Sequence, residues 1–123
     1  MKVGWIGVGN MGKPMAKHVL EAGHEFTVHD LRRESASDLL ETGARWAASP
    51  AEATRGKDVV FTSLPAPVDV DAVALGEKGI LGAMSGNEVF VDLTTNSLSM
   101  VKKLHKAFLE KGFQMLEIGR AHV

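Results

Sequence analysis

Residues 7–12 read Gly7-Val8-Gly9-Asn10-Met11-Gly12, and this stretch decides the fold. It follows a short apolar run at residues 2–7, which has the character of a buried strand. It precedes an amphipathic run at residues 11–22, whose apolar residues recur at helical spacing. A glycine pattern alone is a weak signal, but a strand before it and a helix after it make it specific.

Each glycine of this stretch has a steric role. Gly7 makes the tight turn, Gly9 lets the backbone approach a pyrophosphate, and Gly12 lets the helix pack close to the strand. The phosphates of a dinucleotide would lie against free N–H groups at the positive end of the helix dipole. The stretch therefore predicts a dinucleotide-binding loop.

Apolar and amphipathic runs alternate along the rest of the chain. Further strands are expected at residues 26–29, 44–47, 58–64, 88–93 and 113–116, and helices at 34–41, from Pro50, at 68–74 and at 97–111. Ser49 is the expected N-cap of the helix from Pro50, with Glu52 three residues on. This order predicts an α/β fold, a Rossmann-type doubly wound and mostly parallel sheet with strand order 3-2-1-4-5-6.

The apolar spacing also predicts which helix faces are buried. In the first helix Met11, Met15 and Val19 are expected to pack into the core. In the last helix Val101, Leu104 and Phe108 are expected on one apolar face, which Leu109 could join.

An acid at the end of the second strand bears on the choice of cofactor. Asp30 lies 23 residues beyond Gly7, where a carboxylate normally accepts hydrogen bonds from the adenosine ribose. This favours NAD, because the 2′-phosphate of NADP would meet a negative charge. Arg32 and Arg33 oppose that choice: either guanidinium could reach a 2′-phosphate, or both are ordinary surface charges. NADP therefore stays possible.

Other candidate residues follow the fourth and fifth strands, because ligands of open α/β sheets bind outside the carboxyl ends. A turn at Leu64 and Pro65 could pass over the cofactor, and Thr95 could hydrogen-bond near the nicotinamide. Alternatively, Pro65 simply interrupts a loop and Thr95 caps the helix that follows.

The composition narrows the class of protein. The net charge is −1 with both signs interspersed, so no face is expected to bind nucleic acid or a membrane surface. Cysteine is absent, which excludes thiolate sites and fits a cytoplasmic protein. No apolar run approaches the ~18 residues needed to cross a bilayer. The five histidines lack metal-ligand spacing, so no metal site is expected, and no side chain stands out as catalytic.

A family resemblance extends these expectations. The opening of the β-hydroxyacid dehydrogenases, which include 3-hydroxyisobutyrate dehydrogenase, tartronate semialdehyde reductase and the larger 6-phosphogluconate dehydrogenase, closely resembles the run VGWIGVGNMGKPMA at residues 3–16. The likeness runs to about residue 116 and includes EAGH at 21–24, SLP at 63–65, GIL at 79–81 and VDLTT at 91–95.

The resemblance implies a domain of an oxidoreductase that transfers hydride between a nicotinamide cofactor and a small β-hydroxyacid, and whose intact members form homo-oligomers. It implies cofactor contacts at Gly7, Val8, Gly9, Asn10, Met11, Asp30, Leu64, Pro65 and Thr95. Family members often carry asparagine where Asp69 stands here, so the resemblance does not carry a cofactor contact over to this position. The family's catalytic lysine and helical second domain lie beyond this chain, so the chain alone is expected to be inactive.

The last residues depart from the family. After the sixth strand the family continues Asp-Ala-Pro-Val-Ser-Gly-Gly, part of the substrate carboxylate site, whereas residues 117–123 read EIGRAHV. The codons GAG ATC GGA AGA GCA CAC GTC encode this run and, from the second base, resemble a widely used sequencing adapter. We therefore expect an NAD(P)-binding domain at residues 1–116 and a non-native tail at residues 117–123, with a natural divergent tail as the alternative.

Two further functions are compatible with the sequence. One is a stand-alone nucleotide-binding or regulatory module with no chemistry. The other is the cofactor domain of a related imine reductase, which differs in the part that is absent. A stop codon in the source genome after Val123, with no reading frame downstream, would favour the stand-alone module.

Overall fold

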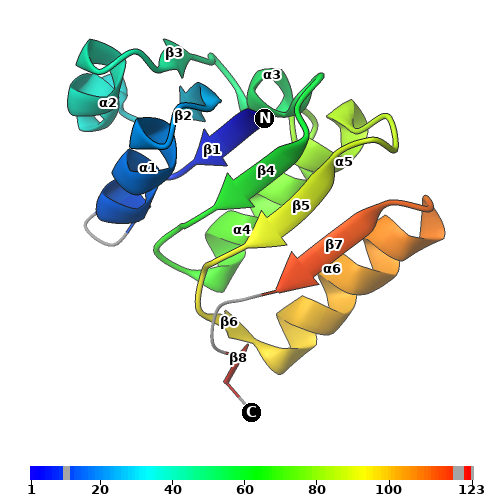
Figure 1. Cartoon of the computed structure of the whole chain (residues 1–123). Coiled ribbons are helices and arrows are strands. Elements are labelled where there is room, and N and C mark those ends of the chain that lie inside the picture. Colours follow the sequence, from blue (N-terminus) through cyan, green and yellow to red (C-terminus); the bar gives the residue numbers. More distant parts are fainter. Residues whose placement is uncertain (10–11, 118–120, 123) are drawn as a thin grey trace.

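Six parallel strands form the central sheet, in a computed structural model that describes residues 1–9, 12–117 and 121–122 (Figure 1). The strand order is β3-β2-β1-β4-β5-β7. This confirms the predicted order 3-2-1-4-5-6, because the short β6 lies outside this sheet. Helices cover both faces, as right-handed crossovers from a central first strand require.

The elements lie close to their predicted positions. The strands of the sheet are β1 (Lys2–Ile6), β2 (Glu25–His29), β3 (Arg45–Trp46), β4 (Val59–Thr62), β5 (Val89–Asp92) and β7 (Gln114–Glu117). The helices are α1 (Gly12–Glu21), the 3-10 helix η1 (Arg33–Ala36), α2 (Ser37–Glu41), α3 (Pro50–Thr54), α4 (Pro67–Leu75), α5 (Ile80–Ala83) and α6 (Leu98–Glu110). A separate parallel pair joins β6 (Asn96–Ser97) and β8 (Ala121–His122).

The sequence did not predict α5 or the β6–β8 pair. Helix α5 has four residues and each strand of the pair has two, which is too short for a periodic pattern to show. The single helix expected at residues 34–41 is instead divided into η1 and α2.

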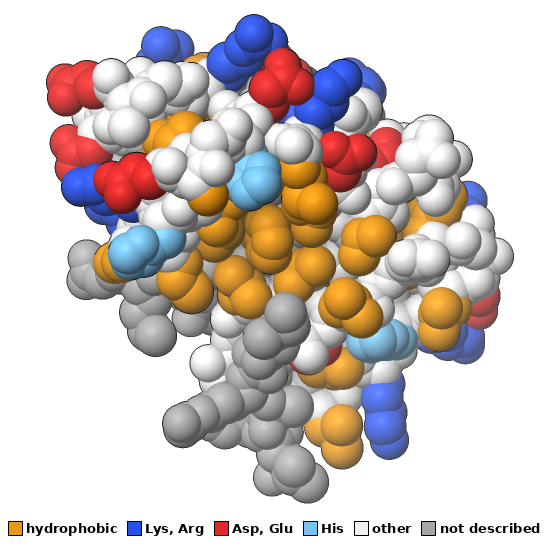
Figure 2. Space-filling view, viewed as in Figure 1, with side chains coloured by type: hydrophobic (Ala, Val, Ile, Leu, Met, Phe, Trp, Pro, Cys, Tyr) orange, Lys and Arg blue, Asp and Glu red, His pale blue; other side chains and the backbone are white. Residues whose placement is uncertain are grey.

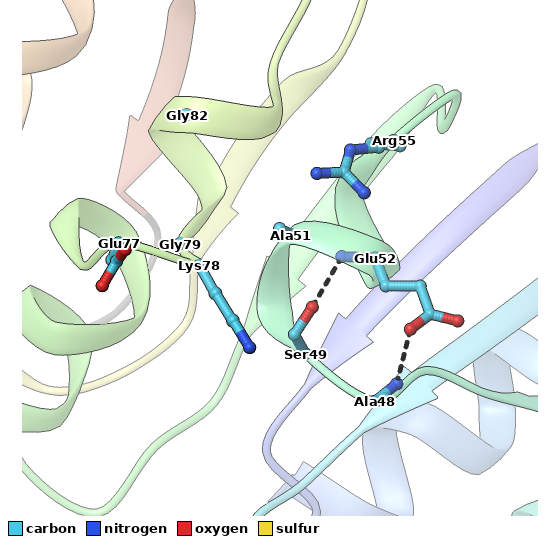
Figure 3. A pocket seen from close by; sticks show the side chains of 9 residues that line it. All are labelled: Ala48, Ser49, Ala51, Glu52, Arg55, Glu77, Lys78, Gly79 and Gly82. Atoms are coloured by element: carbon cyan, nitrogen blue, oxygen red, sulfur yellow. Dashed lines mark hydrogen bonds between the residues drawn. The ribbon is translucent and has the colours of Figure 1, made fainter.

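The predicted capping box of α3 is present. The Ser49 hydroxyl accepts a hydrogen bond from the backbone N–H of Glu52 at 3.1 Å (Figure 3). The Glu52 carboxylate reaches back to accept from the backbone N–H of Ala48 at 3.0 Å (Figure 3). The second donor belongs to Ala48, the residue before the cap, and not to Ser49 itself, so only the Glu52 N–H is a donor that the helix leaves unpaired. Together the two bonds fix where α3 begins.

The buried face of α1 differs from the prediction. Gly12, Ala16 and Leu20 face the core, whereas Met15 is 37% exposed, so its assignment to the core was wrong. Met11 lies outside the described residues. The helix sits so close to β1 that a Cβ added at Gly12 would lie 2.6 Å from the Gly7 carbonyl oxygen, and small residues therefore occupy the inner face.

The buried face of α6 was predicted in part. Leu104 and Phe108 are buried as expected, and Phe108 packs against Phe90 of β5 with ring centroids 5.1 Å apart. Leu109 is 63% exposed, which corrects its expected place on the same face.

Two hydrophobic cores lie on opposite faces of the sheet. One joins β1 and β2 to α1 and α2, and the other joins β4 and β5 to α3 through α6. Trp5 is central to the first, with its ring 5.1 Å from that of Phe61 and 6.1 Å from that of Phe26.

The α1 side of the sheet is covered only in part. Hydrophobic side chains gather in the middle of the view in Figure 2. Phe61, Val91 and Leu116 stand in register across β4, β5 and β7, and Leu116 is 54% exposed. Within the described residues, helices α1 and α2 lie over the β1–β2 half of this face (Figure 1).

A buried carboxylate holds the turn before β5. The backbone N–H groups of Ser85 and Gly86 donate to the Glu88 carboxylate at 2.8 and 3.2 Å. Burial raises the pKa of Glu88, but these hydrogen bonds outweigh burial and hold the pKa below its usual range.

We expect Glu88→Ala to lower the free energy of unfolding at pH 7 by about 1–3 kcal/mol, because it leaves buried backbone donors unpaired. Since the folded pKa of Glu88 is lowered, its stabilisation is complete above the pKa of the unfolded chain and is lost as pH falls through the folded value. Urea unfolding at a series of pH values measures both effects. Glu77→Ala, at an exposed site, is the control; a Glu88 effect that is constant down to acid pH would contradict the assignment.

Candidate functional site

The glycine loop between β1 and α1 is shaped by two close approaches. Gly7 has φ +100°, and a Cβ there would lie 2.2 Å from the Ser63 carbonyl oxygen. Gly12 has no room for a Cβ against the Gly7 carbonyl. Gly9 is different, because it is exposed and a Cβ there would meet no atom of the other described residues within 4 Å. Gly7 and Gly12 are thus required by packing, whereas Gly9 faces open space.

Side chains from two strands hold this loop in place. Trp5 of β1 donates its indole N–H to the Gly7 carbonyl at 2.9 Å. The half-buried Asp30, which follows β2, accepts from the backbone N–H groups of Val8 at 2.8 Å and Arg32 at 3.0 Å. Asp30 therefore lies beside the glycine loop, where the sequence placed it. The contact from Trp5 had no signal in the sequence.

One of the two arginines after β2 lies over an aromatic ring. The Arg33 guanidinium carbon is 5.6 Å from the centre of the Trp46 ring. Trp46 in turn packs against His29, with ring centroids 5.5 Å apart. The His29 Nδ1 atom is hydrogen-bonded to the Ala47 carbonyl at 2.9 Å, so the end of β2 is tied to the end of β3.

The loops after β4 and β5 meet at the same edge of the sheet. Leu64 is half-buried, and its backbone N–H donates to the Thr94 hydroxyl at 2.9 Å. Pro65 and Thr95 are both exposed at this edge. The N-cap of α6 is Ser97, whose hydroxyl accepts from the backbone N–H of Met100 at 3.2 Å. The alternative in which Thr95 caps that helix is therefore wrong.

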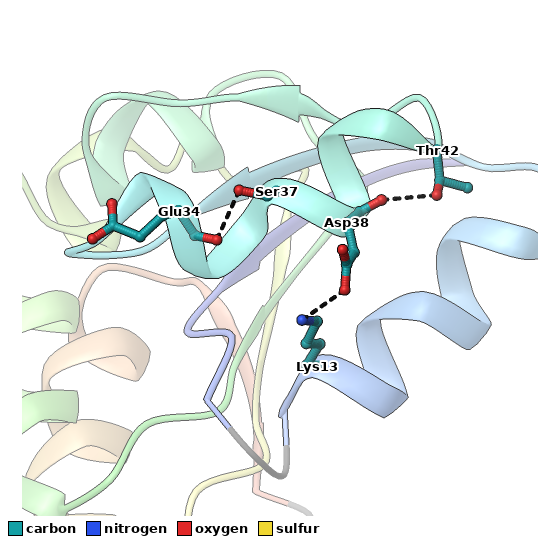
Figure 4. Close-up of polar contacts among 5 residues, drawn as sticks. All are labelled: Lys13, Glu34, Ser37, Asp38 and Thr42. Atoms are coloured by element: carbon teal, nitrogen blue, oxygen red, sulfur yellow. Dashed lines mark hydrogen bonds and ion pairs between the residues drawn. The ribbon is translucent and has the colours of Figure 1, made fainter.

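An ion pair joins the start of α1 to α2. Lys13 and Asp38 are 2.8 Å apart (Figure 4). The hydrogen bond and charge of Lys13 hold the pKa of Asp38 below its usual range. Thr42 donates its hydroxyl to the Asp38 carbonyl at 2.8 Å, and Ser37 donates to the Glu34 carbonyl at 2.8 Å (Figure 4). Both side chains are exposed, so the ion pair contributes little to the free energy of unfolding. Its main effect is to orient α2 relative to the start of α1.

Two surface hollows lie away from this edge. One, of about 330 Å³, is lined by α3 and the residues around Gly79 (Figure 3). The other, of about 490 Å³, lies by the amino ends of the strands and includes Lys2 and Lys57. Burial and the charges of Lys2 and Arg45 lower the pKa of Lys57. Neither hollow contains any residue predicted to bind the cofactor.

Two further features are absent from the described part of the chain. No group of three histidine, aspartate or glutamate side chains could hold a metal ion there. None of the helices described has both the length and the apolar character that a membrane span requires.

The described residues fit a pyrophosphate. Gly9 leaves its side of the loop open, and α1, of 10 residues, begins directly after the loop with no acidic residue in its first turn. An anion at this helix end would therefore meet no opposing carboxylate there. Asn10 and Met11, the remaining predicted loop contacts, lie outside the described residues.

An open parallel sheet, a glycine loop between its first strand and first helix, and an acid after the second strand together define a dinucleotide-binding domain of the Rossmann type. The family model of the NAD-binding domain of 6-phosphogluconate dehydrogenase matches residues 2–120. The chain belongs to this family.

Named relatives agree with this membership. The chain is 38% identical over 112 residues to the uncharacterized oxidoreductase YfjR of Bacillus subtilis, a match that covers 91% of the chain and 39% of YfjR. It is 35% identical over 115 residues to 3-hydroxyisobutyrate dehydrogenase of Pseudomonas aeruginosa, covering 94% of the chain and 39% of that enzyme.

A solved structure supports the fold. The chain matches Psf3 in complex with NADP+ and 2-OPP at 31% identity, with a TM-score of 0.86. The match covers 92% of this chain and 40% of that one. The chain thus spans 39–40% of the length of these three proteins.

We expect Gly9→Val to weaken NAD binding at least about tenfold while the thermal midpoint stays close to that of the parent chain. The structure has room for the side chain, so the loss would come from a clash with bound pyrophosphate. Calorimetric titration and thermal unfolding measure the two effects. Gly82→Val, at a second open glycine far from the loop, is the control. If folded Gly9→Val protein bound NAD with unchanged affinity, the assignment of this loop as the pyrophosphate site would be wrong.

Proposed function

We propose that this chain is the cofactor domain of an NAD-dependent oxidoreductase that transfers hydride between the nicotinamide and a small β-hydroxyacid. The observation that carries the proposal is the open loop at Gly9 beside the tethered carboxylate of Asp30. The relative named 3-hydroxyisobutyrate dehydrogenase, 35% identical, favours a hydroxyacid substrate over the imine of a related reductase. The proposed domain spans residues 1–116, and the proposed location is the cytoplasm.

The residues proposed to bind the cofactor lie along the edge of the sheet formed by the carboxyl ends of its strands. The loop residues Gly7, Val8, Gly9, Asn10, Met11 and Gly12 would hold the pyrophosphate, and Asp30 would accept hydrogen bonds from the adenosine ribose. Leu64, Pro65 and Thr95 would border the nicotinamide half, because their loops meet at this edge. When bound, the cofactor supplies the hydride acceptor; these residues bind it and orient it.

The relatives extend well beyond this chain, which covers 39% of the length of the named dehydrogenase. We propose that the substrate site and the general acid/base lie in the remaining part of the intact enzyme. We therefore expect this chain to bind the cofactor but not to catalyse turnover.

We expect the chain alone to bind NADH and to leave NAD+ unreduced in the presence of 3-hydroxyisobutyrate. Calorimetry measures the binding, and absorbance at the NADH maximum measures turnover. A stand-alone nucleotide-binding module would give the same result with this chain, but its source gene would end at this domain. Steady NAD+ reduction by the chain alone would contradict the placement of the acid/base outside it.

The end of β2 favours NAD over NADP. Both oxygens of Asp30 already accept backbone N–H groups, which fixes the carboxylate where the ribose is expected. A 2′-phosphate near it would be repelled, by about 4 kcal/mol per unit charge at ~4 Å and a dielectric near 20 before screening. Arg33 is stacked over Trp46 and would have to leave that contact to offset the repulsion.

We expect the chain to bind NAD at least about tenfold more tightly than NADP at matched ionic strength. Asp30→Asn should narrow this ratio, because the amide keeps one acceptor oxygen and loses the charge. Asp58→Asn is the matched control, since Asp58 also accepts a backbone N–H, from Lys2 at 2.7 Å, but away from the loop. Equal affinities in the parent chain would overturn the preference, and an unchanged ratio in Asp30→Asn would show another cause.

A further inference from the structure

Four polar side chains are buried behind the edge where the loops after β4 and β5 meet. They are Thr62, Asp92, Thr94 and Asn96, none more than 3% exposed. Burying a carboxylate and an amide is costly unless hydrogen bonds compensate. A cluster of this kind inside a small domain therefore requires either a full set of partners or a function.

Asp92 lies at the centre of this cluster. One of its carboxylate oxygens accepts from the Thr62 hydroxyl at 2.8 Å and from the backbone N–H of Thr94 at 3.0 Å. Its other oxygen accepts from the Asn96 side-chain amide. Three donors, from β4, from the loop after β5 and from β6, thus converge on one acceptor-only group.

The cluster reaches the loop after β4 through Thr94. The Thr94 hydroxyl accepts from the backbone N–H of Leu64, while its own N–H is held by Asp92. These hydrogen bonds fix the backbone at Leu64 and Thr94. The exposed residues Pro65 and Thr95 come directly after these two positions in the sequence. Asp92 itself has no exposed surface and cannot touch a ligand at the edge.

We propose that Asp92 is a positioning residue for the nicotinamide half of the cofactor: it fixes the loops of Leu64–Pro65 and Thr95 relative to each other. This inference rests on the proposed function. The adenosine half, at the glycine loop and Asp30, is held by separate contacts. Disturbing Asp92 should therefore weaken binding of the nicotinamide half alone.

Asn96 provides the means to test this. Its side-chain oxygen is buried and has no hydrogen-bond partner within the described residues. If Asp92 becomes asparagine, the Asn96 amide can turn so that this oxygen accepts from the new amide. If Asn96 becomes aspartate instead, two buried carboxylates face each other, which is strongly unfavourable. The Asn96 amide also donates to the Glu117 Oε2 atom at 3.4 Å, so a carboxylate at position 96 would meet that second carboxylate as well.

The experiment compares NADH with AMP, which keeps adenine, ribose and one phosphate but lacks the nicotinamide half. We expect Asn96→Asp to weaken NADH binding about tenfold or more, by the repulsion of like charges, and to leave AMP affinity within about twofold. Asp92→Asn should have a smaller effect on NADH. Titrations are made below the measured thermal midpoint of every variant.

Thr54→Ala is the matched control, because Thr54 is also a fully buried threonine with a side-chain hydrogen bond, to the Pro50 carbonyl at 2.8 Å in α3. It should lower stability and leave both affinities unchanged. Should Asn96→Asp not fold, Asp92→Asn alone decides the matter by its ratio of NADH to AMP affinity.

Parallel losses of NADH and AMP affinity in Asn96→Asp, or unchanged affinities for both, would each overturn the role of Asp92. So would a parent chain that binds NADH no more tightly than AMP. If the parent chain bound neither NADH nor AMP, the proposed function itself would be wrong. This outcome is distinguishable, because the parent chain is measured before any variant.

Discussion

The Gly7 carbonyl is the point on which the rest of this molecule depends. Its oxygen accepts a hydrogen bond from the indole N–H of the buried Trp5. The same oxygen would lie only 2.6 Å from a Cβ at Gly12, so that position has to be glycine. The first bond ties the loop to the core of β1, and the second contact lets α1 begin against the sheet. Because α1 starts there, its free N–H groups point to the edge at which the loops after β2, β4 and β5 also end.

Two aspartates hold that edge by the same physical means and with different exposure. Asp30 follows a strand and Asp92 ends one, and each carboxylate accepts a backbone N–H from the loop that follows it: Arg32 donates to Asp30, and Thr94 donates to Asp92. Asp30 also accepts the backbone N–H of Val8 in the glycine loop. Asp30 stays half-exposed and can meet a ligand, whereas Asp92 is sealed behind Thr94. A carboxylate suits both places because it accepts several hydrogen bonds and donates none.

Much of the fold could be predicted from the sequence because its signals are local. The glycine spacing, the apolar strands and the capping box at Ser49 each involve residues within a few positions of one another. Predictions failed where a distant contact decided the outcome. Met15 was expected in the core, but the close approach of α1 to β1 selects Ala16 for that face. The open choice of cap for α6 was a local one: Ser97, two residues beyond Thr95, holds that position.

The sequence by itself determined the strand order, the place of the glycine loop and the position of Asp30, since turn sterics and the handedness of crossovers leave few alternatives. Only the tertiary structure decided which side chains hold the site together. The bond from Thr62 to Asp92 joins residues 30 positions apart, and that from Leu64 to Thr94 spans the same separation. No local pattern reports such a contact, because the sheet must form before the carboxyl ends of β4 and β5 become neighbours.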